Sequence, residues 1–317
     1  MTLVSTVIPV FNRAAMLDAA VASVLAQTHR PIEIVVVDDG STDDTPARAD
    51  AIAAAHPEVV VIHQSNAGPG AAREAGRRAA RGEFVQFLDS DDLLWPRKFE
   101  LQVAALERAP ECGVAYGWTR LIVNGAIDEK PWKHTGERIE TMFPSMLQSR
   151  WWGTPTPLYR AAVLERAGGW TSLRTEEDWE LDCRIAALGV RLAYVEEWVS
   201  DSIFHGGEQL SVGAPARTAA VLRDRAKAHA LILGHARAAG IGADVPEMQH
   251  FARELFLLAR QCGAAGLPSE AAMLFDLARD ASGPRRDRLQ FRLYAALARL
   301  GGWTAAGKLS AAIDRLR

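Results

Sequence analysis

The chain has 317 residues, of which 49% are apolar and 24% are charged, and its formal net charge is −3. These proportions are ordinary for a globular protein and exclude wholesale disorder. The slight negative charge lacks the basic footprint of proteins that depend on nucleic-acid phosphates. The length fits one large α/β domain, or one domain with an appendage.

The cysteines and the apolar segments indicate the cellular compartment of the protein. Cys112, Cys183 and Cys262 lie far apart and form no Cys-x-x-Cys pair, so neither a disulfide framework nor a zinc site is expected. Residues 1–9 lack the basic and long apolar regions of a signal peptide, which predicts a first strand and a cytoplasmic location. No stretch reaches the roughly 18 apolar residues of a membrane span. Basic residues among the apolar ones of the last third nevertheless leave peripheral contact with the inner face of a membrane open.

Short β-branched runs alternate with Ala-rich stretches from residue 3 to about 120. This alternation predicts an α/β fold with a Rossmann-like, mostly parallel sheet flanked by helices. Thr42 or Asp43 is suited to cap one helix, and Pro69 and Pro96 are suited to first turns. The predicted strands are 4–10, 32–37, 59–63, 83–88 and 113–122, and the predicted helices are 14–27, 43–55, 69–80 and 96–108.

The remainder is irregular at first and then helical. Residues 121–160 carry prolines among aromatics, so we expect loops around a site and a short helix. A helix at 177–188 and a strand at 190–195 follow. After about residue 214, Ala, Leu and Arg recur at helical spacing, which predicts an α-helical C-terminal region. The predicted domains are 1–213, with halves 1–120 and 121–213, and 214–317.

Polar residues follow the predicted strands at their carboxyl ends, where ligands collect in an open α/β sheet. Asp89, Ser90, Asp91 and Asp92 are the sharpest group, because carboxylates at i and i+2 after a buried strand converge on a hard cation such as Mg²⁺ or Mn²⁺. A metal-bound diphosphate is the natural ligand. The same aspartates also fit a strand end and a helix cap.

Two other strand ends are ambiguous by themselves. Asp38 and Asp39 with Gly40 fit a tight turn, and equally a carboxylate that accepts a hydrogen bond from a base or ribose. Residues 66–73 open a helix whose N-terminus favours anions, with Arg73 one turn inside; the alternative is a loop with a solvated arginine.

Taken in order, these segments resemble the family 2 glycosyltransferases, which have the GT-A fold. The resemblance covers about residues 3–211. The resembling segments are 7–13 (Val-Ile-Pro-Val-Phe-Asn-Arg), 36–45 (Val-Val-Asp-Asp-Gly-Ser-Thr-Asp-Asp-Thr), 66–76, 82–92, 157–160, 167–170 and 176–181.

The resemblance implies a donor site for a nucleoside-diphosphate sugar and an inverting, metal-dependent transfer. Pro9, Phe11, Asp39 and Arg73 would surround the nucleotide, with Asp39 facing the base. Asp89 would hold the ribose side and Asp91 the metal, Mn²⁺ or Mg²⁺, which His205 would complete. The predicted donor site also includes Arg13, Gly68 and Ser90.

The resemblance also implies an acceptor half, in which Glu177 and Asp178 match the acidic pair that supplies the catalytic base, with Asp178 as the base itself. Trp152 and Trp179 are the predicted acceptor contacts, although aromatics at these positions are equally typical of a core. Glu177 and Asp178 also fit first-turn acids that favour a helix dipole, and His205 also fits an ordinary loop histidine.

Glu74 departs from the family pattern, because relatives commonly carry a small amide after the arginine. The departure puts the hydrogen bonding near the phosphates in doubt.

The sequence therefore predicts a hexosyltransferase that uses a UDP-sugar by default and acts on a carbohydrate or glycolipid acceptor. Bacterial surface polysaccharide or glycolipid synthesis is the expected role, and the C-terminal helices are candidates for a homodimer contact. A nicotinamide dehydrogenase does not fit, because Gly68, Gly70 and Gly76 neither follow the first strand nor have Gly-x-Gly-x-x-Gly spacing. A sugar nucleotidyltransferase and a noncatalytic nucleotide-sugar-binding scaffold are the alternatives.

Overall fold

The computed structural model describes residues 2–205 and 218–314. The chain forms two compact units. The first consists of Met1–Met142, Trp151–Leu173 and Leu188–Gly206, and the second of Phe143–Arg150, Arg174–Ala187 and Gly207–Arg317. The predicted domain boundary at 213/214 lies outside the described residues.

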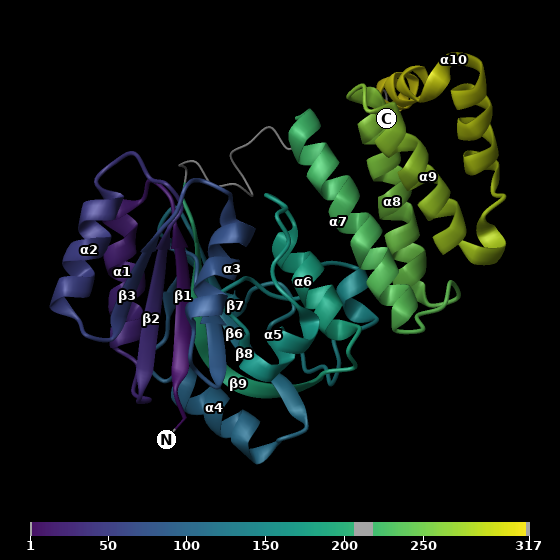
Figure 1. The fold of residues 1–317 in the computed structure, drawn as a ribbon. Coiled ribbons are helices and arrows are strands. Elements are labelled where there is room, and N and C mark those ends of the chain that lie inside the picture. The colour runs from purple at the N-terminus through teal and green to yellow at the C-terminus, as the bar shows by residue number, and fades with distance from the viewer. Residues whose placement is uncertain (1, 206–217, 315–317) are drawn as a thin grey trace. The chain divides into compact units, whose positions relative to one another are not determined.

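The first unit contains a mixed sheet in which nine strands of the described chain run in the order β3-β2-β1-β4-β8-β6-β9-β5, with β7 paired to β6 (Figure 1). Strands β1 to β4 are mutually parallel, and so are β6 and β9, whereas β8 is antiparallel to both of its neighbours. The strands are β1 Val4–Val10, β2 Ile32–Asp38, β3 Val59–His63, β4 Phe84–Phe87, β5 Leu93–Leu94, β6 Cys112–Val123, β7 Ala126–Pro131, β8 Leu158–Arg160 and β9 Arg191–Phe204.

Helices cover both faces of the parallel strands, because alternate apolar residues point to opposite faces. Ile34 and Val36 of β2 belong to a core cluster that includes residues of α1 and α4, while Val35 and Val37 pack with Ala72 of α3. Gly76 lets α3 approach β1 closely, since a Cβ there would lie 2.3 Å from Cγ1 of Val7. The helices of this unit are α1 Ala14–Leu25, α2 Thr45–Ala55, α3 Pro69–Ala79, α4 Lys98–Arg108 and α5 Ala161–Ala167.

The predicted elements of this region are confirmed in kind and order, with helix ends shortened by one to two residues. Pro69 stands in the first turn of α3 as predicted. Asp43 accepts a hydrogen bond from the N–H of Thr45 at 2.9 Å and so satisfies a donor at the start of α2. Pro96 lies just before α4, which begins at Lys98.

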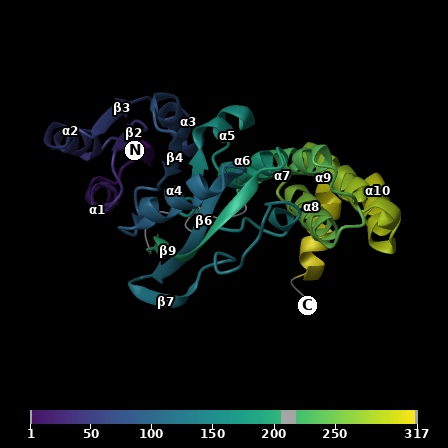
Figure 2. The same ribbon diagram turned by 90° about the horizontal axis from the view of Figure 1, so that it is seen from below.

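The expectation of irregular loops over 121–160 is partly wrong. Strands β6 and β7 form a hairpin there, which Figure 2 shows beside β9. The turn is Asn124-Gly125, with φ of 49° and 82°, and Asn-Gly is the pair that a two-residue hairpin turn favours. Strand β9 also runs to Phe204, beyond the predicted end at 195, because it pairs with the whole length of β6.

The second unit is helical, as predicted for the C-terminal region. Rings of α8, α9 and α10 pack together in it: Phe256 lies 4.9 Å from Phe291 and 5.3 Å from Tyr294 between centroids, and Phe275 lies 5.1 Å from Trp303. The helices are α6 Glu177–Ala186, α7 Ala219–Ala238, α8 Pro246–Ala264, α9 Pro268–Ala281 and α10 Leu289–Asp314, with short 3₁₀ turns at Ser145–Leu147 and Gly283–Arg285.

Gly307 of α10 packs against the backbone of α8. A Cβ at Gly307 would lie 2.3 Å from the nitrogen of Ala264 and 2.4 Å from the carbonyl carbon of Gly263. We expect Gly307→Ala to destabilise the protein by about 1–3 kcal/mol, because backbone atoms cannot yield as a flexible side chain would. Urea denaturation followed by circular dichroism measures the change.

Gly234→Ala is the matched control. Gly234 lies within α7 and a Cβ there meets nothing within 4 Å. Alanine should stabilise this helical position by roughly 0.5–1 kcal/mol. Equal urea midpoints for Gly307→Ala and wild type would contradict the close helix packing.

Candidate functional site

The loops that follow β1, β2 and β3 are joined to one another by hydrogen bonds. The N–H of Asn12 donates to the hydroxyl of Ser41 at 2.9 Å, and the N–H of Thr42 donates to the Asn12 side-chain oxygen at 2.8 Å. The Asn66 amide donates to the carbonyl of Asp39 at 3.0 Å. Because β1, β2 and β3 are parallel, these loops lie at one edge of the sheet, where the sequence predicts the donor site.

Asp39 holds the loop that precedes α3. One carboxylate oxygen accepts from the N–H of Ala67 at 2.9 Å and from the Gln64 amide at 2.7 Å, and the other accepts from the N–H of Gly68 at 2.8 Å. Gly68 takes a φ of 92° at this point. The structure thus gives Asp39 a positioning role at the start of α3, and its contact with a base stays a prediction.

Arg73 and Asp89, both predicted to contact the donor, form an ion pair. The Arg73 guanidinium donates to a carboxylate oxygen of Asp89 at 2.6 Å and lies over the ring of Trp170, 4.9 Å from its centroid. Arg73 is buried, whereas the Asp89 side chain is about one third exposed. The pair therefore presents a carboxylate to solvent with a guanidinium held behind it.

Glu74 fixes the position of Trp170. Its carboxylate accepts from the N–H of Trp170 at 3.1 Å and from the guanidinium groups of Arg77 and Arg78 at 2.7–3.0 Å. The two arginines outweigh the effect of burial and lower the pKa of Glu74 to about 2. Glu74 thus binds α3 to the segment that carries Trp170, and the family departure at this position has a structural role.

Asp91 contacts both Arg13 and His205. A single carboxylate oxygen of Asp91 is paired with the Arg13 guanidinium and lies 3.2 Å from Nε2 of His205. Arg13 follows β1 and His205 follows β9, so three distant segments meet at this oxygen. The predicted metal ligands Asp91 and His205 are therefore neighbours in the structure.

Asp92, the last residue of the predicted acidic group, is a buried carboxylate beside this pair. It accepts a hydrogen bond from the N–H of Ile203 at 2.8 Å and so joins the end of β4 to β9. Burial raises its pKa well above the usual range, and the charges of Asp89 and Asp91 raise it further. In the sequence, its place in the unbroken run of residues 89–92 (Asp-Ser-Asp-Asp) indicates that it belongs to the site.

The residues at this edge suit a divalent ion only with help from a ligand. Among residues 2–205 and 218–314, no group of three or more His, Cys, Asp or Glu side chains is arranged to hold a metal. Asp91 and His205 supply one carboxylate oxygen and one imidazole nitrogen, both suitable for Mn²⁺. Mg²⁺ and Mn²⁺ sites with few protein ligands are completed by phosphate oxygens and water, so this pair fits a metal carried by a diphosphate.

The other predicted donor residues differ in exposure. Phe11 is 44% exposed, which leaves its ring free to stack on a ligand, and Pro9 is partly buried at the end of β1. Ser90 is buried between the aspartates. These placements make Phe11 the accessible aromatic of this edge.

The acidic pair belongs to the second unit. Asp178 is paired with the guanidinium of Arg150, whose Nε donates to the fully buried Asp182 at 2.8 Å. Glu177 begins α6 and is buried. The Trp179 indole donates to the carbonyl of Met146 at 2.8 Å. Arg150 had no sequence signal, because it lies 28 residues before Asp178 in an irregular segment.

Trp152 is a correction to the predicted acceptor contacts. Its ring has no exposed surface and lies 5.2 Å from the ring of Tyr116 between centroids. Trp152 is therefore a core residue of the first unit in this structure. Trp179 is partly exposed and stays a predicted acceptor contact.

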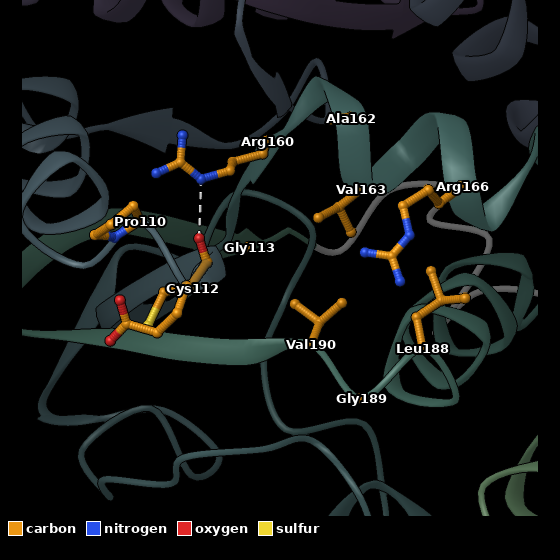
Figure 3. A pocket seen from close by; sticks show the side chains of 11 residues that line it. Pro110, Cys112, Gly113, Arg160, Ala162, Val163, Arg166, Leu188, Gly189 and Val190 are labelled. Atoms are coloured by element: carbon orange, nitrogen blue, oxygen red, sulfur yellow. Dashed lines mark hydrogen bonds between the residues drawn. The ribbon is translucent and has the colours of Figure 1, made fainter.

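A hollow of about 230 Å³ lies away from these residues, at the start of β6 near Cys112 (Figure 3). Figure 3 shows Arg160 on one side of it and Arg166 on the other. Arg160 donates to the carbonyls of Cys112 and Leu106 at 2.9 and 2.8 Å, which closes the end of β8 against β6. None of the predicted site residues lines this hollow.

Comparison with known proteins gives family matches. Residues 5–167 match the sequence model described as glycosyl transferase family 2. An uncharacterized glycosyltransferase of Rickettsia conorii is 31% identical over 229 residues, which cover 70% of this chain and 37% of that protein. An uncharacterized glycosyltransferase of Nostoc sp. is 36% identical over 168 residues, which cover 51% of this chain and 52% of that protein. The chain spans well under two thirds of the length of these relatives.

Solved structures share the fold. TarS 1–349 of S. aureus in complex with UDP aligns with a TM-score of 0.71 and 20% identity, over 100% of this chain and 92% of that one. The mannosyltransferase PcManGT of Pyrobaculum calidifontis, in complex with GDP-Man and Mn²⁺, aligns with a TM-score of 0.52 and 22% identity, over 99% and 86%. These likenesses confirm the predicted GT-A fold.

Glu74→Gln should lower stability by about 3 kcal/mol at pH 7, because the pKa of Glu74 is lowered from 4.5 to about 2 and one pKa unit corresponds to about 1.4 kcal/mol. A carboxylate with a lowered pKa stabilises the fold above pH 4.5, and this contribution is lost as the pH falls toward 2. Urea midpoints at pH 7 and at pH 3.5 measure the difference between variant and wild type.

Glu83→Gln serves as the control, since Glu83 is exposed and pairs with Arg160 at 3.3 Å. It should change stability by less than about 0.5 kcal/mol. If the stability difference between Glu74→Gln and wild type stayed constant down to pH 3, the charge of Glu74 would not be the cause of the stabilisation.

Proposed function

We propose that this chain, which belongs to glycosyl transferase family 2 and is a glycosyltransferase, moves a sugar from a nucleoside diphosphate to an acceptor hydroxyl with inversion of configuration. The observation that carries the proposal is the meeting of Asp91, Arg13 and His205 beside the Arg73–Asp89 pair. This edge of the sheet combines two guanidinium groups, two carboxylates and an imidazole. Such a set matches a metal diphosphate better than it matches a neutral ligand.

The donor is a nucleotide sugar, with a UDP-sugar as the first candidate. TarS of S. aureus has been solved with UDP and with UDP-GlcNAc, and PcManGT with GDP-Man and Mn²⁺. By analogy of fold, Phe11 stacks on the nucleotide and Asp89 binds the ribose. Asp39 acts on the base side by shaping the 66–68 loop.

Asp91 and His205 are the proposed ligands of Mn²⁺ or Mg²⁺. A divalent ion supplies positive charge that stabilises the departing diphosphate. Arg13 shares the Asp91 oxygen that would hold such an ion, and its guanidinium would be available to pair with phosphate oxygens of the donor. Arg73 keeps its place because Trp170 and Asp89 hold it from two sides.

Asp178 is the proposed general base, and it accepts the proton of the acceptor hydroxyl as the new glycosidic bond forms at the anomeric carbon. Arg150 orients the Asp178 carboxylate and is itself held by the buried Asp182. Arg150 is thus a positioning residue. Trp179 contributes a face for an acceptor sugar, and a single displacement by this arrangement inverts the anomeric configuration.

We further propose a bacterial role in surface polysaccharide or glycolipid synthesis, with a carbohydrate or glycolipid acceptor. The family match and the bacterial sources of the matching glycosyltransferases support this role.

Asp91→Ala should weaken Mn²⁺-dependent nucleotide binding by at least about tenfold, because it removes the carboxylate that joins protein and ion. Calorimetric titration with UDP, GDP and dTDP, each with and without Mn²⁺, measures this loss. Asp128→Ala in the exposed strand β7 is the matched control and should bind as wild type does. Nucleotide binding that is equally tight without metal, and equal in Asp91→Ala, would overturn the metal assignment.

Asp178→Asn should reduce turnover by about 10²-fold or more while it leaves nucleotide binding unchanged, because the amide cannot accept the proton. Release of UDP from UDP-GlcNAc, with water or an added sugar as acceptor, measures turnover. Asp276→Asn on the exposed face of α9 is the control. Undiminished release by Asp178→Asn would remove it as the base, and synthesis of a nucleotide sugar from a triphosphate would instead favour a nucleotidyltransferase.

A further inference from the structure

Four leucines form an exposed stripe along the first part of α10. Leu289, Leu293, Leu297 and Leu300 are 68%, 56%, 38% and 89% exposed. Their spacing of four, four and three residues places them on one face of the helix. Exposed leucines are ordinary when single, but a continuous row on one helix face indicates a binding surface.

The leucine stripe is not the buried side of the helix. The opposite face of α10 carries Phe291, Tyr294 and Ala298, which are buried and pack on the ring cluster of α8 and α9. Since α10 already has a packed apolar face, the leucines are a second apolar face that the core of this unit does not use.

The charge beside the stripe is entirely positive. Arg292 and Arg299 are seven residues apart and so lie in a row next to the leucines, with Arg288 one turn before Arg292. The sequence has no Asp or Glu between residues 288 and 313. Asp287, just before this segment, is paired with Arg279 and Arg286.

The second part of α10, which ends at Asp314, also carries exposed apolar residues after a break. The backbone leaves the helical conformation at Gly302, where Figure 1 shows α10 change direction. Beyond it, Leu309 and Ile313 are 46% and 45% exposed and four residues apart, next to Lys308. Across the part of the chain that the structure describes, no helix is long and apolar enough to cross a bilayer.

We infer that the face of α10 formed by Leu289, Leu293, Leu297 and Leu300 binds an anionic lipid surface, with the helix parallel to the membrane plane. A row of leucines flanked by arginines is the pattern of an interfacial helix, whose apolar side chains enter the acyl boundary while cations contact acidic headgroups. A second copy of the chain suits this face less well, because it would add further arginines to a face with no carboxylates. The inference does not depend on the proposed sugar transfer.

Vesicle flotation tests this inference with the full chain. We expect the wild type to float with phosphatidylcholine vesicles that contain about 30% phosphatidylglycerol. It should remain largely unbound with vesicles of phosphatidylcholine alone. Leu293→Gln with Leu297→Gln should reduce partitioning by about tenfold or more. Arg292→Gln with Arg299→Gln should reduce it similarly on the anionic vesicles, and high salt should do the same to the wild type.

Two matched double variants separate this surface from general loss of apolar or basic residues. Val60→Gln with Ile127→Gln removes two exposed apolar side chains from the first unit, and Lys130→Gln with Arg138→Gln removes two exposed charges. Both should float as wild type does. Circular dichroism verifies that all variants fold, and UDP titration of the same proteins reports separately on the proposed donor site.

Three outcomes would overturn the inference. They are a wild type that does not bind anionic vesicles, stripe variants that bind as well as wild type, and a dimer in solution that the leucine variants dissociate while no vesicle binding occurs. A wild type that floats with anionic vesicles but binds no nucleotide would count against the proposed donor site and would still support the lipid-binding face.

Discussion

The candidate donor site depends on the concentration of carboxylates at the end of β4. Asp89, Asp91 and Asp92 follow one another within four residues, and their mutual repulsion and burial must be offset for the strand to end there. Each carboxylate is stabilised by its own partners. Arg73 pairs with Asp89, Arg13 and His205 contact Asp91, and Asp92 accepts the N–H of Ile203.

These contacts determine how the first unit is assembled around the site. Arg13 comes from the end of β1, Arg73 from α3, and His205 and Ile203 from the end of β9. The same local charge therefore joins the parallel N-terminal strands to the long β6–β9 pair. The Asp91 oxygen that Arg13 and His205 share is the one proposed to hold a divalent ion, so a bound cation would offset the same negative charge.

In the second unit, two carboxylates share one cationic partner. Arg150 lies between Asp178 and the buried Asp182, so one guanidinium serves both a fully buried carboxylate and a partly exposed one. Asp182 has a structural partner and Asp178 is left at the accessible end. In the part of α10 before Gly302 arginines stand beside leucines without carboxylates, and the inferred lipid-binding face rests on this imbalance.

The sequence by itself determined the α/β order, most helix and strand limits, the helical C-terminal region and which polar residues follow the strand ends. Such features depend on local periodicity, proline and glycine positions and residue type, which are written in short windows. The Asn124-Gly125 turn was equally local and could have predicted the β6–β7 hairpin. Tertiary structure alone decided that Arg150 pairs with Asp178, that Asp39 holds the 66–68 loop, that Glu74 anchors Trp170, and that Trp152 is buried. These outcomes depend on segments far apart in the chain, whose distances no local pattern contains.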